Sequence, residues 1–88
     1  MFEFEWDKNK SLSNKKKHGI DFQEATALFK KGIKVYIAKE LNNEKRYLIS
    51  NFINGKCYSA IFTVRNGKIR IVSVRRCRED EKQRISND

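Results

Sequence analysis

Two Asn-Gly dipeptides, at residues 54–55 and 66–67, constrain the fold of this chain more than any other feature of its sequence. Asn-Gly is the preferred sequence of the two-residue type I′ turn, which joins two antiparallel strands and fixes their register. Both dipeptides lie between segments in which apolar and polar residues alternate, as they do in half-buried strands. The sequence therefore predicts a β-meander with adjacent antiparallel strands over residues 45–53, 56–65 and 68–76.

The residues before the meander predict a short strand and a first helix. Aromatic and acidic residues alternate over residues 2–6, "FEFEW", which is the period of a half-buried strand. Asp7 is a favourable N-cap for the helix that follows, and Gly19 is a favourable residue for its C′ position. The predicted helix, residues 8–18, ends in three lysines and a histidine, where cations stabilise the negative end of the helix dipole.

A second helix, a further strand and a last helix complete the predicted order. Asp21 and Glu24 have the spacing of a capping box, and Gly32 is expected to end the helix that they start. The apolar residues of this helix share one face: Phe22, Ala25, Leu28 and Phe29. Residues 33–38 alternate again and predict a strand, and the charged residues 78–85 predict a short helix after the meander.

We therefore expect one α+β domain over residues 1–88, in which a β-α-α unit precedes an antiparallel β-meander and a short C-terminal helix. The helices are expected to cover one face of a largely antiparallel sheet. A chain of 88 residues has room for one modest core, so a functional site is expected on the surface of this domain.

The composition is strongly basic, with 20 Lys and Arg against 11 Asp and Glu, which gives a formal net charge of +9. Such a field attracts polyanions, so nucleic acid is the first partner to expect and an acidic protein is the second. A membrane surface comes third, because Leu12 is the only large apolar residue in the most basic stretch, residues 7–18. The N-terminal residues lack the basic and apolar regions of a secretion signal, and we expect a cytoplasmic protein.

The cysteines and the single histidine do not form a metal-ligand pattern. Cys57 and Cys77 lie 20 residues apart, and His18 is distant from both in the sequence. Neither a metal ion nor another cofactor is therefore expected. We predict that the two cysteines are free or buried thiols.

The hairpin register predicts which side chains share a face of the sheet. One face is expected to lie under the helices. It carries Tyr47, Ile49, Ala60, Phe62, Val64, Ile69 and Ile71, with Ser73 beside Ala60 and with Arg75 beside Asn51 and Tyr58. A β-bulge in either hairpin would exchange the faces beyond it.

At one end of the other face, the same register gathers a cluster of charged and polar side chains. These are Glu44, Arg46, Thr63, Arg65, Lys68 and Arg70. RNA cleavage needs a base that assists the 2′-hydroxyl and cationic donors that stabilise the charge of the phosphorane. Arginine forks suit phosphate oxygens, and a carboxylate can act as the base or orient an arginine. The alternative is that this cluster is an ordinary solvated surface.

Two roles are open for His18, which follows three lysines in "NKKKHGIDF". It is the side chain whose ordinary pKa lies nearest to neutrality, so it can act as an acid or a base. It is also well placed as a cation that stabilises the C-terminal end of a helix. The spacing of the residues alone favours the helix-terminal role.

Six sequence blocks follow one another along the chain: "FEWDKNK", "NKKKHGIDFQEA", "EKR", "INGKCY", "TVR" and "IRIVSVRR". They resemble, in the same order, the motifs of the BrnT family of bacterial type II toxin-antitoxin systems. The resemblance covers residues 4–79. It implies a RelE-like fold and a ribonuclease that inhibits translation and is neutralised by the antitoxin BrnA.

The resemblance gives weight to seven positions: Lys17, His18, Glu44, Arg46, Thr63, Arg65 and Arg75. The hairpin register independently places four of them in one cluster. We therefore predict a metal-independent endoribonuclease whose catalytic residues are Glu44, Arg46, Arg65 and His18. The predicted RNA contacts are Lys16, Lys17, Thr63, Arg70, Arg75 and Arg76, and a structural role for Arg75 is an open alternative.

The resemblance also implies a BrnA-like antitoxin as partner, in a complex with two copies of each chain that reaches operator DNA through the antitoxin. We expect acidic residues of the antitoxin to cover the arginine cluster or the basic segment 15–18. A non-catalytic basic module that binds nucleic acid is the alternative function, because it would carry the same charge.

Overall fold

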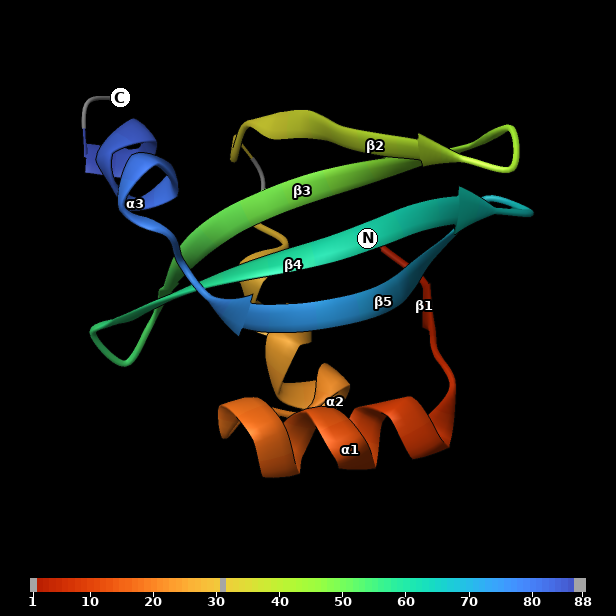
Figure 1. Ribbon diagram of the computed structural model, residues 1–88, viewed down its shortest axis with the longest axis horizontal. Coiled ribbons are helices and arrows are strands. Elements are labelled where there is room, and N and C mark those ends of the chain that lie inside the picture. Colours follow the sequence, from red (N-terminus) through yellow and green to blue (C-terminus); the bar gives the residue numbers. More distant parts are fainter. Residues whose placement is uncertain (1, 31, 87–88) are drawn as a thin grey trace.

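The computed structural model describes residues 2–30 and 32–86, which form an α+β fold (Figure 1). The elements in chain order are β1 (Phe4–Glu5), α1 (Lys8–His18), α2 (Phe22–Ala25), the 3₁₀ helix η1 (Thr26–Leu28), β2 (Val35–Leu41), β3 (Glu44–Ile53), β4 (Lys56–Arg65), β5 (Lys68–Arg76) and α3 (Glu79–Ser86). The strands form one sheet in the order β1-β5-β4-β3-β2. None of the helices in the described ranges is long and apolar enough to cross a membrane.

The predicted β-meander is confirmed. Asn54 and Gly55 have φ angles of 51° and 80°, and Asn66 and Gly67 have φ angles of 52° and 76°, as both residues of a type I′ turn require. The registers that these turns impose are present at each hairpin end, where residue 53 pairs with residue 56 and residue 65 pairs with residue 68. The positions of β3, β4 and β5 therefore follow from the two turns.

A third hairpin, between β2 and β3, was not predicted from the sequence. Its turn is Asn42-Asn43, with φ angles of 52° and 64°. Asparagine is the non-glycine residue that most readily adopts this left-handed backbone, so the Asn-Asn dipeptide could have been used to predict the turn. Because of this hairpin, the sheet continues past β3 to an edge strand, Val35–Leu41, that begins two residues later than expected.

The first helix has the predicted caps but an unexpected mode of packing. The Asp7 side chain accepts the first free backbone N–H groups of α1, and Gly19 adopts the left-handed conformation at its end. The helix has almost no apolar face, and its buried side chains are Ser11 and Asn14. Asn14 donates to the backbone oxygen of Ile20 (2.8 Å) and accepts from the backbone N–H of Val74 (3.2 Å). Polar contacts with the backbone of its neighbours thus hold α1 against β5.

The second helix begins as predicted and ends earlier. Asp21 and Glu24 form the capping box, with each side chain accepting from the other residue's backbone N–H. The helix gives way to a 3₁₀ turn at Thr26, so the prediction that it runs to Gly32 was wrong. The hydroxyl of Thr26 donates to the backbone oxygen of Gln23 at 2.7 Å, a local bond that competes with a regular α-helix.

The capping box gives a direct test of the second helix. We expect Asp21→Ala to lower the free energy of unfolding by about 1 kcal/mol, because the backbone N–H of Glu24 loses its partner. Urea denaturation followed by circular dichroism measures the change. Gln23→Ala, an exposed neighbour on the same helix, should change it by less than about 0.5 kcal/mol; equal losses for both variants would contradict a capping role.

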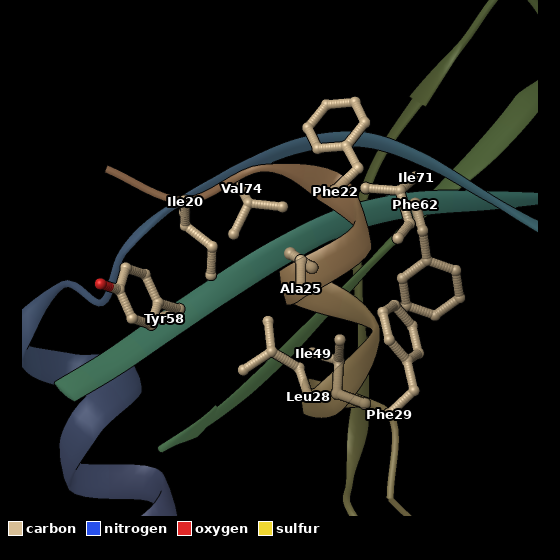
Figure 2. Close-up of a cluster of buried hydrophobic side chains, with 11 residues drawn as sticks. Ile20, Phe22, Ala25, Leu28, Phe29, Ile49, Tyr58, Phe62, Ile71 and Val74 are labelled. Atoms are coloured by element: carbon tan, nitrogen blue, oxygen red, sulfur yellow. The ribbon is translucent and has the colours of Figure 1, made fainter. Parts of the chain in front are cut away.

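The core lies between the sheet and the segment from Ile20 to Phe29 (Figure 2). Figure 2 shows Ala25 and Leu28 projecting from this segment toward β3 and β4, with the ring of Phe29 beside that of Phe62. These two ring centres are 5.0 Å apart in an edge-on arrangement. The remaining core residues on the sheet are Ile49, Tyr58, Ala60, Ile71 and Val74.

A β-bulge in β5 corrects the predicted assignment of faces. Phe62 pairs with Ile71, but its neighbour Ile61 pairs with Ser73, so Val72 is an extra residue in β5. Beyond this point every side chain of β5 lies on the face opposite to the predicted one. The regular register assumed from the turn is therefore wrong for the second half of this strand.

Three consequences follow from the bulge. Val74, and not Ser73, packs opposite Ala60 in the core. Arg75 lies opposite Ser59 on the other face of the sheet, so its predicted place beside Asn51 and Tyr58 was wrong. The shift also continues beyond the strand, because the backbone N–H of Cys77 donates to the backbone oxygen of Cys57 at 3.0 Å.

The same shift explains why the prediction for the cysteines was wrong. Cys57 and Cys77 form a disulfide, with their Cα atoms 5.3 Å apart, and are not free thiols. In the regular register residue 57 would lie opposite residue 76, and the extra residue in β5 brings Cys77 into that place. The disulfide ties the beginning of β4 to the residues that lead into α3.

The last helix lies on the face of the sheet opposite to α1 and α2, whereas all helices were expected on one face (Figure 1). Its buried residue Glu81 accepts from the Ser59 hydroxyl at 2.8 Å and from both terminal nitrogens of Arg75 at 2.8 Å. Ser59 and Arg75 point away from the core, so α3 covers this end of the second face. The other end of that face is left open.

Candidate functional site

The open end of this face carries an ion pair between Glu44, the first residue of β3, and Arg65, the last residue of β4. Arg65 donates from Nε to one carboxylate oxygen at 2.9 Å and from a terminal nitrogen to the other at 3.2 Å. Half of the Arg65 side chain is exposed. An exposed pair of this kind contributes little to stability, so its fixed geometry is the more informative property.

The pair also determines the protonation state of the carboxylate. The hydrogen bonds from Arg65 lower the pKa of Glu44 below its ordinary value, and the charges of Arg65, Arg46 and Arg70 act in the same direction. A carboxylate with a lowered pKa is a weak proton acceptor at neutral pH. Of the two roles left open by the sequence, this favours the orientation of Arg65 over general-base catalysis.

Arg46 is the residue of this cluster whose bonding is incomplete. Its Nε atom is buried, and no hydrogen-bond partner for it is present in the described part of the chain. A buried N–H without a partner costs about 1–3 kcal/mol, so such an atom in a native fold calls for an explanation. The positive charge beside Glu44 and Arg65 gives one, because an anion at this site would supply the missing acceptor.

Thr63 of β4 and Arg70 of β5 also belong to the cluster and lie directly opposite each other in the sheet. The hydroxyl of Thr63 donates to the backbone oxygen of Lys45 at 2.9 Å, and its side chain is almost completely buried. This bond joins β4 to β3 beyond the last pair of their ladder. Arg70 donates to Glu5 of β1 at 3.0 Å, which fixes its direction and offsets part of its charge.

The predicted residues of the first helix form a separate group. Lys16, Lys17 and His18 are exposed at the end of α1. His18 and Lys17 line a shallow pocket next to the bulge of β5, whereas Arg65 lies at the turn before β5. Within the described ranges, no hydrogen bond or ion pair connects His18 with the arginine cluster, so the four predicted catalytic residues do not form one group.

The last two predicted contacts lie at the α3 end of the sheet. Arg75 is bound by both oxygens of Glu81, so its charge is compensated within the fold. Arg76 donates from Nε to the backbone oxygen of Cys57 at 3.2 Å and lies over the ring of Tyr58, 5.6 Å from its centre. The position of Arg75 supports the structural alternative, and Arg76 keeps an exposed guanidinium.

Sequence reasoning missed the two carboxylates that hold arginines in place. Glu5 reaches Arg70 through the parallel pairing of β1 with β5, and Glu81 reaches Arg75 from α3. Neither contact follows from a turn, so the hairpin register gave no signal for them. Among residues 2–30 and 32–86, no three His, Cys, Asp or Glu residues come together as a possible metal site.

The described site is thus a cluster of arginines around one ionised carboxylate on an open face of the sheet. Residues 6–81 match the family described as ribonuclease toxin, BrnT, of type II toxin-antitoxin system. The chain belongs to the BrnT family. No curated protein matches the chain. The family match confirms the resemblance that the sequence motifs indicated, and it includes both Glu44 and the arginine cluster.

Membership of the BrnT family indicates what the arginine cluster and the basic end of α1 could bind. A ribonuclease acts on a polyanion, and a toxin of a type II toxin-antitoxin system implies an antitoxin as partner. The net charge of +9 attracts a polyanion such as RNA. The arginine cluster and the basic end of α1 are therefore the surfaces to consider for this BrnT protein.

Proposed function

We propose that this BrnT protein is an endoribonuclease toxin that cleaves RNA at the cluster of Glu44, Arg46 and Arg65. The observation that carries the proposal is the buried Nε of Arg46, which has no partner in the described protein and lies in a group of arginines. A phosphate oxygen is the acceptor that such a site suits best. Cleavage of RNA inhibits translation, and we place this action in the cytoplasm.

The proposed chemistry is transesterification at phosphorus. The 2′-oxygen of the RNA forms a bond to the phosphorus atom as the bond to the 5′-oxygen breaks, which leaves a 2′,3′-cyclic phosphate and a 5′-hydroxyl. The proton of the 2′-hydroxyl passes to water, and the 5′-oxygen takes a proton from water. Arg46 and Arg65 stabilise the negative charge that develops on the phosphorane, and Glu44 holds Arg65 in the required direction.

The remaining cations bind the RNA backbone in this proposal. Lys16, Lys17 and Arg76 are exposed, and Arg70 lies beside the cluster. Each phosphate contact of this kind makes the affinity fall as the salt concentration rises. His18 belongs to the same basic surface and contacts the RNA backbone. Thr63 holds β4 against β3 beneath the cluster, through its hydrogen bond to the backbone oxygen of Lys45.

The antitoxin completes the proposal. A BrnA-like protein binds the toxin, neutralises it and carries it to operator DNA, in a complex with two copies of each chain. Acidic residues on the antitoxin would lie against the arginine cluster or the basic end of α1, and would accelerate the association as well as exclude RNA.

The test is cleavage of a single-stranded RNA by the purified protein, with and without EDTA. We expect products that end in 2′,3′-cyclic phosphate, at a rate that EDTA leaves unchanged, because the proposed groups are side chains of the protein. Dithiothreitol should also have no effect, since Cys57 and Arg65 lie at opposite ends of β4. Gel electrophoresis and mass spectrometry of the products give the rate and the chemistry.

Two other outcomes would contradict the proposal. Salt-dependent RNA binding without cleavage would make the chain a non-catalytic binding module, which is the alternative that the charge alone allows. Cleavage that stops in EDTA and returns with a divalent cation would retain the ribonuclease and remove the proposed mechanism.

A further inference from the structure

The large apolar side chains that are exposed in the described part of the chain gather mainly at one place. Phe2, Val35, Ile37 and Val64 are between 50% and 69% exposed, and Leu12 on α1 is the other member of this set. The registers of β2 and β5 place Val35, Ile37 and Val64 on the face of the sheet that carries the core. A contiguous apolar patch of this kind on a charged protein indicates an interaction surface.

The patch surrounds a groove of about 480 Å³. Phe2, Val35 and Val64 line it at the surface, and Phe29, Tyr47, Ile49, Phe62 and Ile69 line it further inside. The groove exists because the helices cover only part of the sheet. Figure 1 shows α1 and α2 on the side of β5 and β4, while β2 extends beyond them at the opposite edge.

The charges near the groove distinguish between possible occupants. Lys30 lines it, and Lys45 lies beside Tyr47 on the same face, opposite Glu40. A second copy of this chain would bring two net charges of +9 together, which opposes a dimer across this surface. An occupant with apolar side chains toward the groove and acidic residues toward the lysines fits both properties.

The groove is also continuous with the proposed catalytic cluster. Tyr47 and Val64 line both the groove and a neighbouring polar pocket, which contains Glu44, Lys45 and Thr63. Val64 directly precedes Arg65, and their side chains lie on opposite faces at the end of β4. A segment bound in the groove therefore reaches the strand ends, where the polar pocket leads to the face that carries Arg65.

We propose that this groove is the docking site of an amphipathic segment of the antitoxin, which binds with apolar side chains and carries acidic residues at its edges. This inference rests on the proposed toxin function and adds the surface and the chemistry of the partner. The arginine cluster supplies attraction over a distance, whereas the groove supplies the apolar contact area that holds the complex together. Neutralisation then requires the bound segment to continue from the groove past the end of β4 to the face that carries Arg65.

The test compares Val35→Asp with Leu12→Asp. Both residues are exposed valine or leucine side chains, but only Val35 lines the groove, and neither belongs to the proposed catalytic cluster. The binding partner is the protein encoded by the reading frame immediately downstream of the toxin gene, titrated by isothermal calorimetry. We expect Val35→Asp to raise the dissociation constant about 30-fold, because a charge is placed in an apolar contact, and Leu12→Asp to change it less than twofold.

Three further measurements make the result decisive. Circular dichroism shows whether each variant is folded. If Val35→Asp is not, Val35→Thr takes its place: it keeps the branched shape and should weaken binding about fivefold. Both aspartate variants should cleave RNA at the wild-type rate, and only Val35→Asp should resist inhibition by the partner. Unchanged affinity in Val35→Asp would overturn the docking site while RNA cleavage by the wild-type protein upheld the toxin function.

Absence of RNA cleavage would reject the proposed function, and loss of partner binding in Val35→Asp would still identify the groove as a docking surface. A wild-type chain that sediments as a dimer, with Val35→Asp as a monomer, would instead assign the groove to self-association and overturn the inference.

Discussion

Arg46→Ala and Arg65→Ala should each reduce the rate of RNA cleavage by a factor on the order of 100, which is the effect expected when one preoriented charge donor is removed. The Nε of Arg46 is buried and has no hydrogen-bond partner among the residues that the structure describes, and Arg65 is fixed by two hydrogen bonds to Glu44. Arg65 is thus directed before the substrate arrives, and Arg46 has a buried donor that a phosphate oxygen can accept from. Single-turnover cleavage of a labelled RNA measures the loss, and growth arrest on expression should be relieved in parallel.

The matched control is Arg78→Ala, which removes the same charge from an exposed position before α3. It should lower RNA affinity slightly through the net charge and leave the cleavage rate of bound RNA unchanged. If all three variants fold and remain fully toxic, the arginine cluster is an ordinary solvated surface. If Arg78→Ala loses as much activity as the other two, net charge alone explains the effect.

Glu44→Gln separates two roles of the carboxylate. Glutamine can still accept a hydrogen bond from Arg65, so an orienting role predicts a loss of about tenfold, smaller than that of either arginine variant. A general base predicts a loss as large as that of Arg65→Ala. The lowered pKa of Glu44 supports the smaller effect.

Arg46→Lys distinguishes an enzyme from a binding module. Lysine keeps the positive charge but loses the planar fork that binds two phosphate oxygens at once. The ribonuclease proposal expects RNA affinity to remain within about twofold while cleavage falls steeply. A module that only binds phosphate has no cleavage to lose.

The β-meander could be predicted because the residues of its two turns determine how the neighbouring strands pair. Each Asn-Gly turn specifies a left-handed backbone at two successive residues, and this fixes the pairing of the strands on both sides. The prediction failed at Val72, where β5 contains one extra residue. No residue type marks this position, because valine is an ordinary strand residue. The contacts that fit the shifted register come from distant residues: Val74 is buried in the core, and its backbone N–H donates to Asn14 of α1.

The same distinction separates the predicted part of the site from the rest. Glu44 and Arg65 lie in strands whose register comes from turns, and the structure joins them by two hydrogen bonds. The partners of Arg70 and Arg75 come from β1 and α3, whose positions depend on packing and on a disulfide that the bulge makes possible. Long-range ion pairs of this kind have no signature in the local sequence.

Glu81→Gln should lower the stability of the protein far more than removal of an exposed charge on the same helix. Its side chain is 5% exposed and accepts from Arg75, from the hydroxyl of Ser59 and from the backbone N–H of Arg78. The bonds from Arg75 contribute most to lowering its pKa, which reaches about 2. Since one pKa unit corresponds to about 1.4 kcal/mol, the ionised carboxylate stabilises the fold by about 3 kcal/mol.

The direction of the pH dependence follows from this lowered pKa. Below the ordinary carboxyl pKa, Glu81 binds a proton in the unfolded chain but stays ionised in the folded protein. The stabilisation is therefore complete above about pH 4.5 and is lost as the pH falls toward 2. Urea denaturation between pH 2 and pH 7 should show this loss in the wild-type protein. In Glu81→Gln, which lacks the titrating group, the corresponding slope should be absent.

Glu79→Gln is the control, because Glu79 is exposed on the same helix. It should change the free energy of unfolding by less than about 0.5 kcal/mol and leave the acid slope unchanged. Equal effects of the two variants would mean that α3 is held by its general charge. A selective effect of Glu81→Gln would mean that Glu81 fixes α3 on the sheet and binds Arg75, which leaves Arg46, Arg65 and Arg70 of the cluster to contact RNA.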